Sequence, residues 1–494
     1  MDQNAIDKLR NNAVMPQSHW IGGKQVASQS GEMRTVYSPI DGQPLAQIAE
    51  GGPADVDAAV VAARASFERG DWSRMAPAAR KVIMHRIADK IAEHALELAV
   101  LGVRDNGCEI IMASKAEPGS AMETFRFYAE CVDKVNGDIT ATDRSVLSMI
   151  HKEPIGVAGV IVPWNFPLMI GAWKIAPALA MGNSIVIKPS EVASLSLLRM
   201  IELCHEAGLP EGVLNVVTGD GAGVGSPLAH HMGVDMLTFT GSGRIGRELL
   251  KASAASNMKP IYLELGGKSP NIIFNDAPDL AKAAMVSATA MFRDSGQTCV
   301  APSRLLVQAD IYDEVVERVT NKAKAITVGN PLDLTTDSGA VASETQLAQN
   351  LQFVETAKAE GATLTAGGSR VNAETGGSYM APTVFADVTP EMTLAQEEVF
   401  GPVVGITRFE DEADAVRIAN STIYGLSAAV WTADLGRAHR MIQDIDSGVV
   451  HVNTYGGANV TVPLLGHRQS GNGADKSIYA LDKYTKMKTA WIQL

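Results

Sequence analysis

The fold is decided by the stretch that begins with IGVAGVIVP (residues 155–163) and continues with SIVIKPS (184–190) and DMLTFTGSG (235–243). Each of these runs is short, apolar and rich in β-branched residues, and helical stretches of about 10–15 residues separate them. Apolar strands that alternate with helices are typical of a parallel sheet with crossover helices. Residues from about 150 to 265 are therefore predicted to form a doubly wound domain of the nucleotide-binding type.

A second alternating series runs from Asn271 to about Val452 and predicts another α/β unit. Upstream of both series, helices are expected from Pro53 onward, over residues 76–103 and over residues 121–135. The tail YTKMKTAWIQL (484–494) has the character of a strand, but no partner strand lies near it in the sequence. Such a strand needs a sheet edge in the same chain or in a neighbouring copy.

The composition is that of a folded, acidic protein of two or three domains. Of 494 residues, 46% are apolar and 20% are charged, and 55 acidic against 42 basic residues give a formal net charge of −13. A chain with this charge lacks the basic surface that binds nucleic acid, and it does not favour anionic lipid. No apolar run reaches the roughly 18 residues of a membrane span, and the first residues lack the apolar stretch of a signal peptide, so a cytoplasmic location is predicted.

The four cysteines, Cys108, Cys131, Cys204 and Cys299, are scattered and form no C-x-x-C pair. This usage is typical of a reducing compartment and argues against a disulfide framework. The histidines show no spacing that is typical of metal ligands, so no metal site is expected.

Two positions in the doubly wound domain are candidates for nucleotide binding. The segment Gly241-Ser-Gly243-Arg-Ile-Gly246 matches G-x-G-x-x-G after an apolar run, and Glu264 further on fits the acid that binds the ribose. Alternatively, Lys188 and Glu191 follow the run SIVI directly, at the strand end where ligands bind in open α/β sheets. A carboxylate at Glu191 could accept hydrogen bonds from both ribose hydroxyls, and Glu264 would then be free for another role. The residues alone leave both interpretations open.

Cys299 is the candidate nucleophile. An isolated cysteine is usually a small buried hydrophobe. Cys299 differs because it lies in the polar segment DSGQTCVAPSR (294–304), after the turn residue Gly296, and an acidic residue without an obvious partner occurs in ELGGKSP (264–270). A thiol close to backbone N–H groups is expected to have a lowered pKa and to react as a thiolate.

These motifs together resemble the NAD(P)-dependent aldehyde dehydrogenase superfamily, and the resemblance covers nearly the whole chain. The ending SGNGADKS with YTKMKT is most similar to the γ-glutamylaminobutyraldehyde and ω-aminoaldehyde dehydrogenases. The motifs that carry the resemblance occur in the family's order: PWNFP (163–167), KPSE (188–191), FTGS (239–242), ELGGKSP (264–270), GQTC (296–299) and EEVFGP (397–402).

The resemblance implies a covalent mechanism for the oxidation of an aldehyde to a carboxylic acid. Cys299 would attack the aldehyde to give a thiohemiacetal and then a thioester, and the Asn165 side chain with the Cys299 N–H would hold the oxyanion. Glu264 would activate the water that hydrolyses the thioester. Lys174 and Asp475 match positions that relay the proton outward.

The resemblance also implies NAD as the cofactor, a small-molecule aldehyde as the substrate, and no metal. The residues expected to bind the cofactor are Trp164, Lys188, Ser190, Glu191, Gly241, Ser242, Gly246, Leu265, Glu398 and Phe400. The residues expected to line the substrate pocket are Phe166, Ile170, Trp173, Gly456 and Leu464.

Departures from the family pattern bear on the substrate. The sequence PLLG (463–466) stands where PFGG is usual, and Gly456 and Gly457 stand where bulkier side chains are common. Small residues beside Trp173 predict a roomy, mostly apolar pocket. The expected substrate is a bulky, aromatic, long-chain or ω-substituted aldehyde.

The resemblance implies an aldehyde-dehydrogenase-like α/β fold in three parts. Residues 1–130 and 152–266 would form the NAD-binding domain and residues 267–465 the catalytic domain. Residues 131–151 and 466–494 would form a small β oligomerisation element, whose tail pairs with a neighbouring subunit in a homo-oligomer, a dimer or a tetramer.

Three alternatives remain at this point. A CoA-acylating semialdehyde dehydrogenase would lack the glutamate at position 264, and a non-catalytic binding or structural relative would be expected to lose Cys299 or Glu264. The same thiol could also support thiol-esterase activity. Dependence of the reaction on NAD separates these activities.

Overall fold

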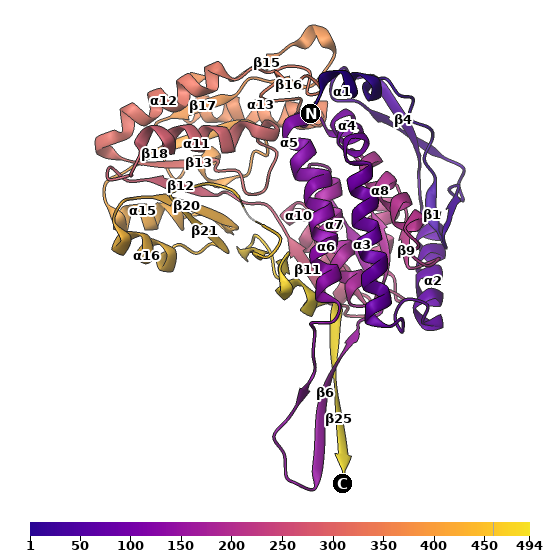
Figure 1. Cartoon of the computed structure of the whole chain (residues 1–494). Coiled ribbons are helices and arrows are strands. Elements are labelled where there is room, and N and C mark those ends of the chain that lie inside the picture. Colours follow the sequence, from indigo (N-terminus) through magenta and orange to yellow (C-terminus); the bar gives the residue numbers. More distant parts are fainter. Residues whose placement is uncertain (458) are drawn as a thin grey trace.

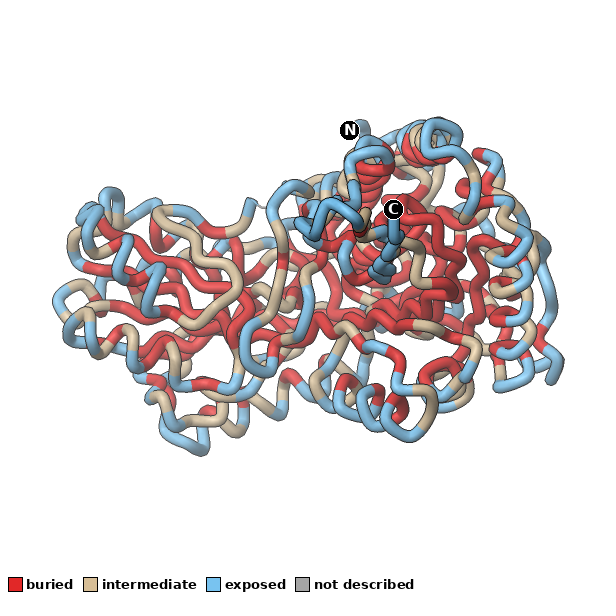
Figure 2. Tube along the Cα trace, turned by 90° about the horizontal axis from the view of Figure 1, so that it is seen from below, coloured by how far each residue is buried: buried red, intermediate tan, exposed pale blue. Residues whose placement is uncertain are grey.

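The computed structural model describes residues 1–457 and 459–494 and consists of two α/β lobes with a long β arm that projects from them (Figure 1). Both lobes are buried along their sheets, whereas the end of the chain at the tip of the arm is exposed (Figure 2). Among the helices in the described ranges, none combines the length and the apolar character that crossing a membrane requires.

The first lobe contains the doubly wound sheet that the sequence predicts. Its parallel strands lie in the order β11-β10-β7-β8-β9, and two short antiparallel strands extend the sheet beyond β9. The order reverses between β7 and β10, so a crevice for ligands is expected beyond the carboxyl ends of these two strands. The strands are β1 (His19–Ile21), β2 (Lys24–Val26), β7 (Val157–Ile161), β8 (Ser184–Lys188), β9 (Leu214–Val216), β10 (Met236–Thr240) and β11 (Ile261–Glu264).

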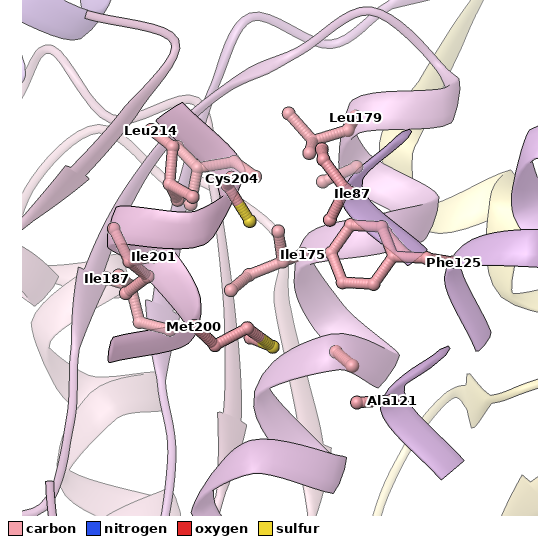
Figure 3. Close-up of a cluster of buried hydrophobic side chains, with 14 of the residues drawn as sticks. Ile87, Ala121, Phe125, Ile175, Leu179, Ile187, Met200, Ile201, Cys204 and Leu214 are labelled. Atoms are coloured by element: carbon pink, nitrogen blue, oxygen red, sulfur yellow. The ribbon is translucent and has the colours of Figure 1, made fainter. Parts of the chain in front are cut away.

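Helices cover both faces of this sheet. Side chains from α3, α6, α7 and α8 pack on one face, where Phe125, Ile175 and Met200 meet residues of β8 and β9 (Figure 3). Helices α2, α9 and α10 pack on the other face. The helices of this lobe are α1 (Gln3–Arg10), α2 (Pro53–Arg69), α3 (Pro77–Glu93), α4 (Ala95–Asn106), α5 (Ile110–Ser114), α6 (Ser120–Cys131), α7 (Pro167–Ala180), α8 (Leu195–Glu206), α9 (Ser226–His230) and α10 (Gly243–Ala254).

One expectation about these helices needs correction. The helix expected over residues 76–103 is two helices, α3 and α4, which meet at His94. The break is at a residue that ends one helix and begins the next with non-helical backbone angles, and apolar periodicity on both sides of it hides the change of direction.

The second lobe contains the other predicted α/β unit. Its sheet has the order β14-β17-β18-β13-β12-β20-β21, parallel except at the edge strand β14. Helices α11 and α12 pack on one face, and α15 and α16 pack on the other. The elements are β12 (Pro270–Ile273), α11 (Leu280–Phe292), β13 (Arg304–Gln308), α12 (Tyr312–Ala325), α13 (Glu344–Ala359), β14 (Thr363–Ala366), β17 (Thr383–Ala386), α14 (Thr393–Gln396), β18 (Val403–Phe409), α15 (Glu412–Ala419), β20 (Ser427–Trp431), α16 (Leu435–Asp444) and β21 (Val449–Val452).

The arm is a separate antiparallel sheet of β25, β6 and β5 (Figure 1). Residues Thr485 to Gln493 of β25 pair without a break with residues 146–154 of β6. The tail therefore has a partner strand within its own chain, which is one of the two possibilities that the sequence leaves open. The sequence hides the pairing because more than 300 residues separate the two strands. The strands of the arm are β5 (Asp138–Ile139), β6 (Val146–Pro154) and β25 (Thr485–Gln493).

Short strands complete the structure at the edges of the lobes. They form four two-stranded pairs, β3 with β4, β15 with β16, β19 with β23, and β22 with β24. Their bounds are β3 (Met33–Tyr37), β4 (Pro44–Ala49), β15 (Arg370–Val371), β16 (Tyr379–Met380), β19 (Tyr424–Gly425), β22 (Leu464–Leu465), β23 (His467–Arg468) and β24 (Ala474–Asp475).

Candidate active site

The candidate site lies where the two lobes meet, beyond the carboxyl ends of β7 and β10. A cavity of about 270 Å³ opens there. Its walls bring together segments that are far apart in the sequence. Such a crevice is expected where the strand order of an open α/β sheet reverses. The residues that line it include Pro163, Trp164, Asn165, Ile170, Gly241, Ser242, Leu265, Gly266, Cys299, Glu398 and Phe400.

Cys299 differs from the other cysteines in its exposure. Cys108, Cys131 and Cys204 are buried, and Cys299 alone of the cysteines in the described chain is partly exposed and faces the cavity. Cys204, for example, packs among the apolar side chains of α8 and its neighbours (Figure 3). The exposure of Cys299 fits a residue that must meet a ligand, whereas the other three behave as small buried hydrophobes.

Tight backbone turns carry Cys299 to the cavity wall. Asp294 and Ser295 adopt φ angles of 49°, and Gly296 follows with a φ of 71°. A Cβ atom at Gly296 would lie 2.3 Å from the Gly401 carbonyl oxygen, so only glycine fits. A Cβ atom at Gly267 would similarly lie 2.3 Å from the carbonyl oxygen of Cys299. The glycines of GQTC and ELGGK therefore let these segments and EEVFGP approach each other closely.

The structure contradicts the expectation that the Cys299 thiol has a lowered pKa. Burial raises its pKa well above the ordinary value, and negative charges on Glu264 and Glu398 raise it further. The N–H groups of Val300 and Cys299 lower the pKa, as the sequence suggested, but they do not outweigh burial. The thiol must therefore lose its proton to a base as it reacts.

Asn165 lies beside the Cys299 segment. Its Nδ2 group donates to the backbone carbonyl oxygen of Gln297 at 2.8 Å, and its backbone carbonyl oxygen accepts from Asn106 Nδ2 at 2.9 Å. The bond to Gln297 holds the side chain on the cavity wall and leaves the second N–H of its amide group for a ligand, and the bond from Asn106 holds the backbone. Its position suits a donor to an oxyanion at the Cys299 sulfur.

Glu264 ends β11 and is only 4% exposed. Neither of its carboxylate oxygens has a hydrogen-bond partner among the described residues. Burial, together with the negative charge of Asp475, raises its pKa well above the ordinary value, against the influence of Lys174 and Lys483. A buried carboxyl group with free oxygens and a raised pKa is a candidate general acid or base.

Lys174 and Asp475 form a buried ion pair behind Glu264. Lys174 Nζ lies 2.9 Å from Asp475 Oδ2 and also donates to Thr238 Oγ1 at 3.1 Å. Lys483 pairs with the other oxygen of Asp475. Although burial opposes ionisation, the two lysines hold the pKa of Asp475 far below its usual range. Lys483 was not identified from the sequence, because nothing in its spacing marks it as a partner of Lys174.

The residues after β8 form the second candidate nucleotide site. Lys188 is buried, and its Nζ lies 2.6 Å from Oε2 of Glu191, which is partly exposed. Ser190 lies between them and accepts the N–H of Val192. This arrangement holds the carboxylate of Glu191 beyond the strand end, where a ribose would lie.

The G-x-G-x-x-G segment has the strand–turn–helix geometry of a phosphate site. Gly241 follows β10, and Ser242 caps α10 by accepting the N–H of Ile245 at 3.4 Å. A Cβ atom at Gly246 would lie 3.0 Å from the side chain of Leu265, so Gly246 allows α10 to pack against the chain after β11. Gly241 and Ser242 line the cavity directly before α10, so the N-terminus of this helix lies at the cavity, a placement that suits a diphosphate.

Glu398 and Phe400 line the same cavity from the second lobe. Glu398 accepts the N–H of Gly267 at 2.9 Å, and burial raises its pKa to about 7. Phe400 has a φ angle of 57° and packs edge-on against Trp164, with ring centroids 5.3 Å apart. Both side chains are held in place before any ligand arrives.

The residues expected in the substrate pocket are divided between several places. Ile170 lines the cavity with Cys299, and Trp173 lines a second cavity of about 870 Å³. Phe166 is buried in the core of the first lobe, and Leu464 belongs to β22, paired with Asp475. Gly456 has a φ of 77°, and a Cβ atom there would lie 3.0 Å from the guanidinium of Arg293. Of the loop 454–465, Ala458 lies outside the described residues.

The cavity beside Trp173 has a mixed wall, which the sequence did not predict. Apolar side chains include Met112 and Met169. Lys476 also lines it, with its Nζ 5.3 Å from the centre of the Trp173 ring. Burial lowers the pKa of Lys476, while Asp475, Glu264 and Cys299 raise it, so its ammonium group lies near the candidate catalytic residues. The other charged residues of the wall are Glu109, Lys115, Glu123, Arg293 and Asp337.

No group of three or more His, Cys, Asp or Glu side chains suited to a metal ion occurs within residues 1–457 and 459–494.

Comparisons with known proteins agree with this geometry. The model of the aldehyde dehydrogenase family matches residues 25–490. The NADP/NAD-dependent aldehyde dehydrogenase PuuC of Escherichia coli K12 is 45% identical over 475 residues, which cover 96% of this chain and 95% of that protein.

Two solved structures are similar to this chain over their whole length, and both to the same degree. The γ-glutamyl-γ-aminobutyraldehyde dehydrogenase of Burkholderia cenocepacia is 43% identical, with a TM-score of 0.98 and full coverage of both chains. The AldA indole-3-acetaldehyde dehydrogenase of P. syringae, determined in complex with NAD+, has the same identity, TM-score and coverage.

Proposed function

The chain belongs to the aldehyde dehydrogenase family and is an NAD(P)-dependent oxidoreductase, and we propose that Cys299 is its nucleophile and Glu264 its general base. The observation that carries the proposal is the meeting of Cys299, Asn165 and Glu398 on one cavity, with Glu264 close enough that its charge acts on the thiol. The test is the substitution of both residues: Cys299→Ala should abolish turnover, and Glu264→Gln should stop it at the thioester.

The residues around the cavity fit a dinucleotide. Glu191 would hold the adenosine ribose, with Lys188 fixing its carboxylate, and the N-terminus of α10 with Gly241 and Ser242 would hold the diphosphate. Glu398 would hold the second ribose, and Trp164 and Phe400 would flank it. When bound, NAD accepts a hydride from the substrate carbon.

The remaining steps belong to the chain's own side chains. The thiol of Cys299, which is partly exposed, loses its proton to solvent water as the sulfur bonds to the aldehyde carbon, and Asn165 with the Cys299 N–H stabilises the oxyanion of the thiohemiacetal. Oxidation of that carbon leaves a thioester. Glu264 then takes a proton from water, whose oxygen attacks the thioester carbon; the C–S bond breaks and releases the acid and the Cys299 thiolate, which takes up a proton from solvent. Lys174 and Asp475 carry the proton away from Glu264.

We expect NAD to be preferred over NADP. The carboxylate of Glu191 would repel a 2′-phosphate at a few ångströms, so kcat/KM should be about tenfold or more higher with NAD. Steady-state kinetics with both cofactors measure this ratio, and Glu191→Gln should shift it toward NADP. An equal or higher kcat/KM with NADP in the wild type would refute the expectation.

We infer that the substrate is a bulky, aromatic, long-chain or ω-substituted aldehyde. The cavity of about 870 Å³ beside Trp173 supports this, because its apolar wall can take methylene groups or a ring. Its acidic residues Glu123 and Asp337, and its basic residues Lys115 and Lys476, can meet a polar group at the far end. Similarity to proteins named for γ-glutamyl-γ-aminobutyraldehyde and for indole-3-acetaldehyde supports the same class.

A series of aldehydes tests this inference. Since each buried methylene contributes about 0.8 kcal/mol, longer or aromatic aldehydes should exceed acetaldehyde in kcat/KM by several-fold to about a hundredfold. NADH absorbance would be followed with acetaldehyde to octanal and with phenyl-, indolyl- and ω-amino-substituted members. The highest kcat/KM for acetaldehyde would rule out the bulky class.

We propose that residues 131–151 and 466–494 form an oligomerisation element that joins copies of this chain, and that residues 1–130 with 152–266 and residues 267–465 form the cofactor and catalytic domains. The edge strand β25 supports this, because Met487 and Trp491 are 75% and 65% exposed on it. Light scattering should give a dimer or a tetramer for the full chain and a smaller species when residues 485–494 are removed. A monomeric full chain would overturn the proposal.

A further inference from the structure

A group of acidic side chains lies behind the loop that carries Cys299. Glu109, Glu117 and Asp294 are 5%, 3% and 1% exposed, and the thiol of Cys108 lies among them. None of the three carboxyl groups forms an ion pair within 4.0 Å with a cation in the described chain. They take no part in the proposed catalytic steps, although Glu109 also lines the cavity beside Trp173, and each costs free energy to bury and therefore needs a structural reason.

Glu109 is bonded directly to the start of the loop. Both of its carboxylate oxygens accept the N–H of Asp294, at 3.2 and 3.0 Å. Asp294 and the next residue, Ser295, are the two with left-handed backbone angles just before Gly296. Such angles are strained for residues with a Cβ atom, and they persist only where neighbouring groups hold them.

The same segment of chain also holds the Asn165 side of the site. Asn106 Nδ2 donates to the carbonyl oxygen of Asn165 at 2.9 Å. Glu117 accepts the N–H of Met169 at 2.7 Å, in the first turn of α7, which directly follows Asn165. Residues 106–117 therefore contact both the Cys299 loop and the segment that carries Asn165, and the bond from Asn165 Nδ2 to Gln297 joins the two.

We propose that Glu109 is a positioning residue that holds the loop of Cys299 in register with Asn165. The proposal rests on the proposed roles of Cys299 as nucleophile and Asn165 as oxyanion donor. Without the acceptor at Glu109, the N–H of Asp294 is buried without a partner, and the loop relaxes from its left-handed angles. The distance from the sulfur to the oxyanion site then changes, although neither residue is itself replaced.

The charge state of the group decides which substitution should be tolerated. Burial raises the pKa of Glu109 to about 7 and that of Glu117 to about 8, and it raises the pKa of Asp294 further. The positive charge of Arg293 lowers the pKa of Glu109, and the negative charge of Asp337 raises it. At neutral pH the group therefore holds protons, so glutamine, which is neutral and keeps an acceptor oxygen, should replace Glu109 well.

A matched pair of variants in the full-length enzyme tests the proposal. Glu109→Met keeps the length of the side chain but removes the acceptor, and it should lower kcat about 10- to 100-fold, with the KM for NAD changed less than about threefold. Glu109→Gln keeps an acceptor oxygen of the same reach and should recover most of the kcat that Glu109→Met loses. Glu93→Gln, an exposed glutamate at the end of α3, is the surface control.

The second measurement is the rate at which iodoacetamide alkylates Cys299, followed by mass spectrometry of its peptide. The rate should change in Glu109→Met and not in Glu109→Gln, because it reports the position of the loop without any turnover. It therefore separates failure of this proposal from failure of the nucleophile assignment, which Cys299→Ala tests. Wild-type kcat in Glu109→Met, an equal loss in both variants, or a loss confined to KM would overturn the positioning role.

A double variant covers the case in which Glu109→Met does not fold. Glycine adopts left-handed angles without strain, so Glu109→Met with Asp294→Gly should restore folding and most of kcat. A double variant that is no better than the single one would contradict the proposal.

Discussion

Replacement of Cys299 by alanine is expected to lower kcat for aldehyde oxidation by at least about 10⁴-fold, and to abolish ester hydrolysis as well. Both reactions require the sulfur, because no described side chain of the cavity other than Cys299 carries a thiol. The fold should not change, since Cys299 is partly exposed and does not belong to an apolar core. NADH absorbance and the release of a chromogenic ester product measure the two activities.

Cys131→Ala is the matched control, because Cys131 is buried at the end of α6, away from the cavity. It should keep wild-type kcat. Substantial aldehyde oxidation by Cys299→Ala would refute a covalent mechanism through this cysteine. Ester hydrolysis that survives while oxidation is lost would assign the esterase reaction to another group.

The substitution Glu264→Gln is expected to lower the steady-state rate by about 10²- to 10⁴-fold while the first turnover still produces NADH. Glutamine keeps the shape of the side chain but accepts no proton from water, so the thioester forms and then persists. Stopped-flow absorbance should show a burst of NADH followed by a slow phase. The exposed Glu248→Gln on α10 is the control and should show wild-type steady-state turnover.

The same variant distinguishes the CoA-acylating alternative. If CoA were the natural acceptor, wild-type turnover would depend on CoA, and Glu264→Gln would keep the full CoA-dependent rate. If water is the acceptor, the wild type needs no CoA. Unchanged steady-state turnover of Glu264→Gln without CoA would exclude Glu264 as the base.

The sequence predicts the doubly wound sheet because its strands are short apolar runs with helices between them. This pattern is local, so it can be recognised from residues that are close together in the sequence. It also predicts the place of Gly241 at the end of a strand, since the carboxyl ends of parallel strands meet at one edge, and it marks Cys299 by the polar segment and the turn at Gly296. The structure places both on the same cavity wall. Local pattern and topology therefore account for the place of Gly241, whereas the roles of the site residues follow from the resemblance to the family and stay predictions.

Contacts between distant segments could not be predicted in the same way. Asp475 is balanced by two lysines, one of them 301 residues away, and Glu109 reaches Asp294 over 185 residues. The pairing of the tail with β6 likewise joins two segments that are far apart in the sequence. The periodicity of the sequence reports only the helix or strand in which a residue lies. These contacts depend on how distant segments pack against each other, so periodicity cannot predict them.

The pKa of Cys299 shows how a correct position can give a wrong chemical inference. The amide dipoles that the sequence suggests are present, but burial and the charges of Glu264 and Glu398 act more strongly on the thiol. Electrostatics at the site depend on the whole surroundings, of which the motif GQTC is a small part.

The covalent claim is tested most directly by mass spectrometry of Glu264→Gln after it is mixed with octanal and NAD. If Cys299 forms a thioester, the intact mass should rise by the octanoyl group, the peptide containing Cys299 should carry it, and the adduct should require NAD. Glu264→Gln that remains unmodified, or that carries the acyl group on a peptide without Cys299, would contradict the account.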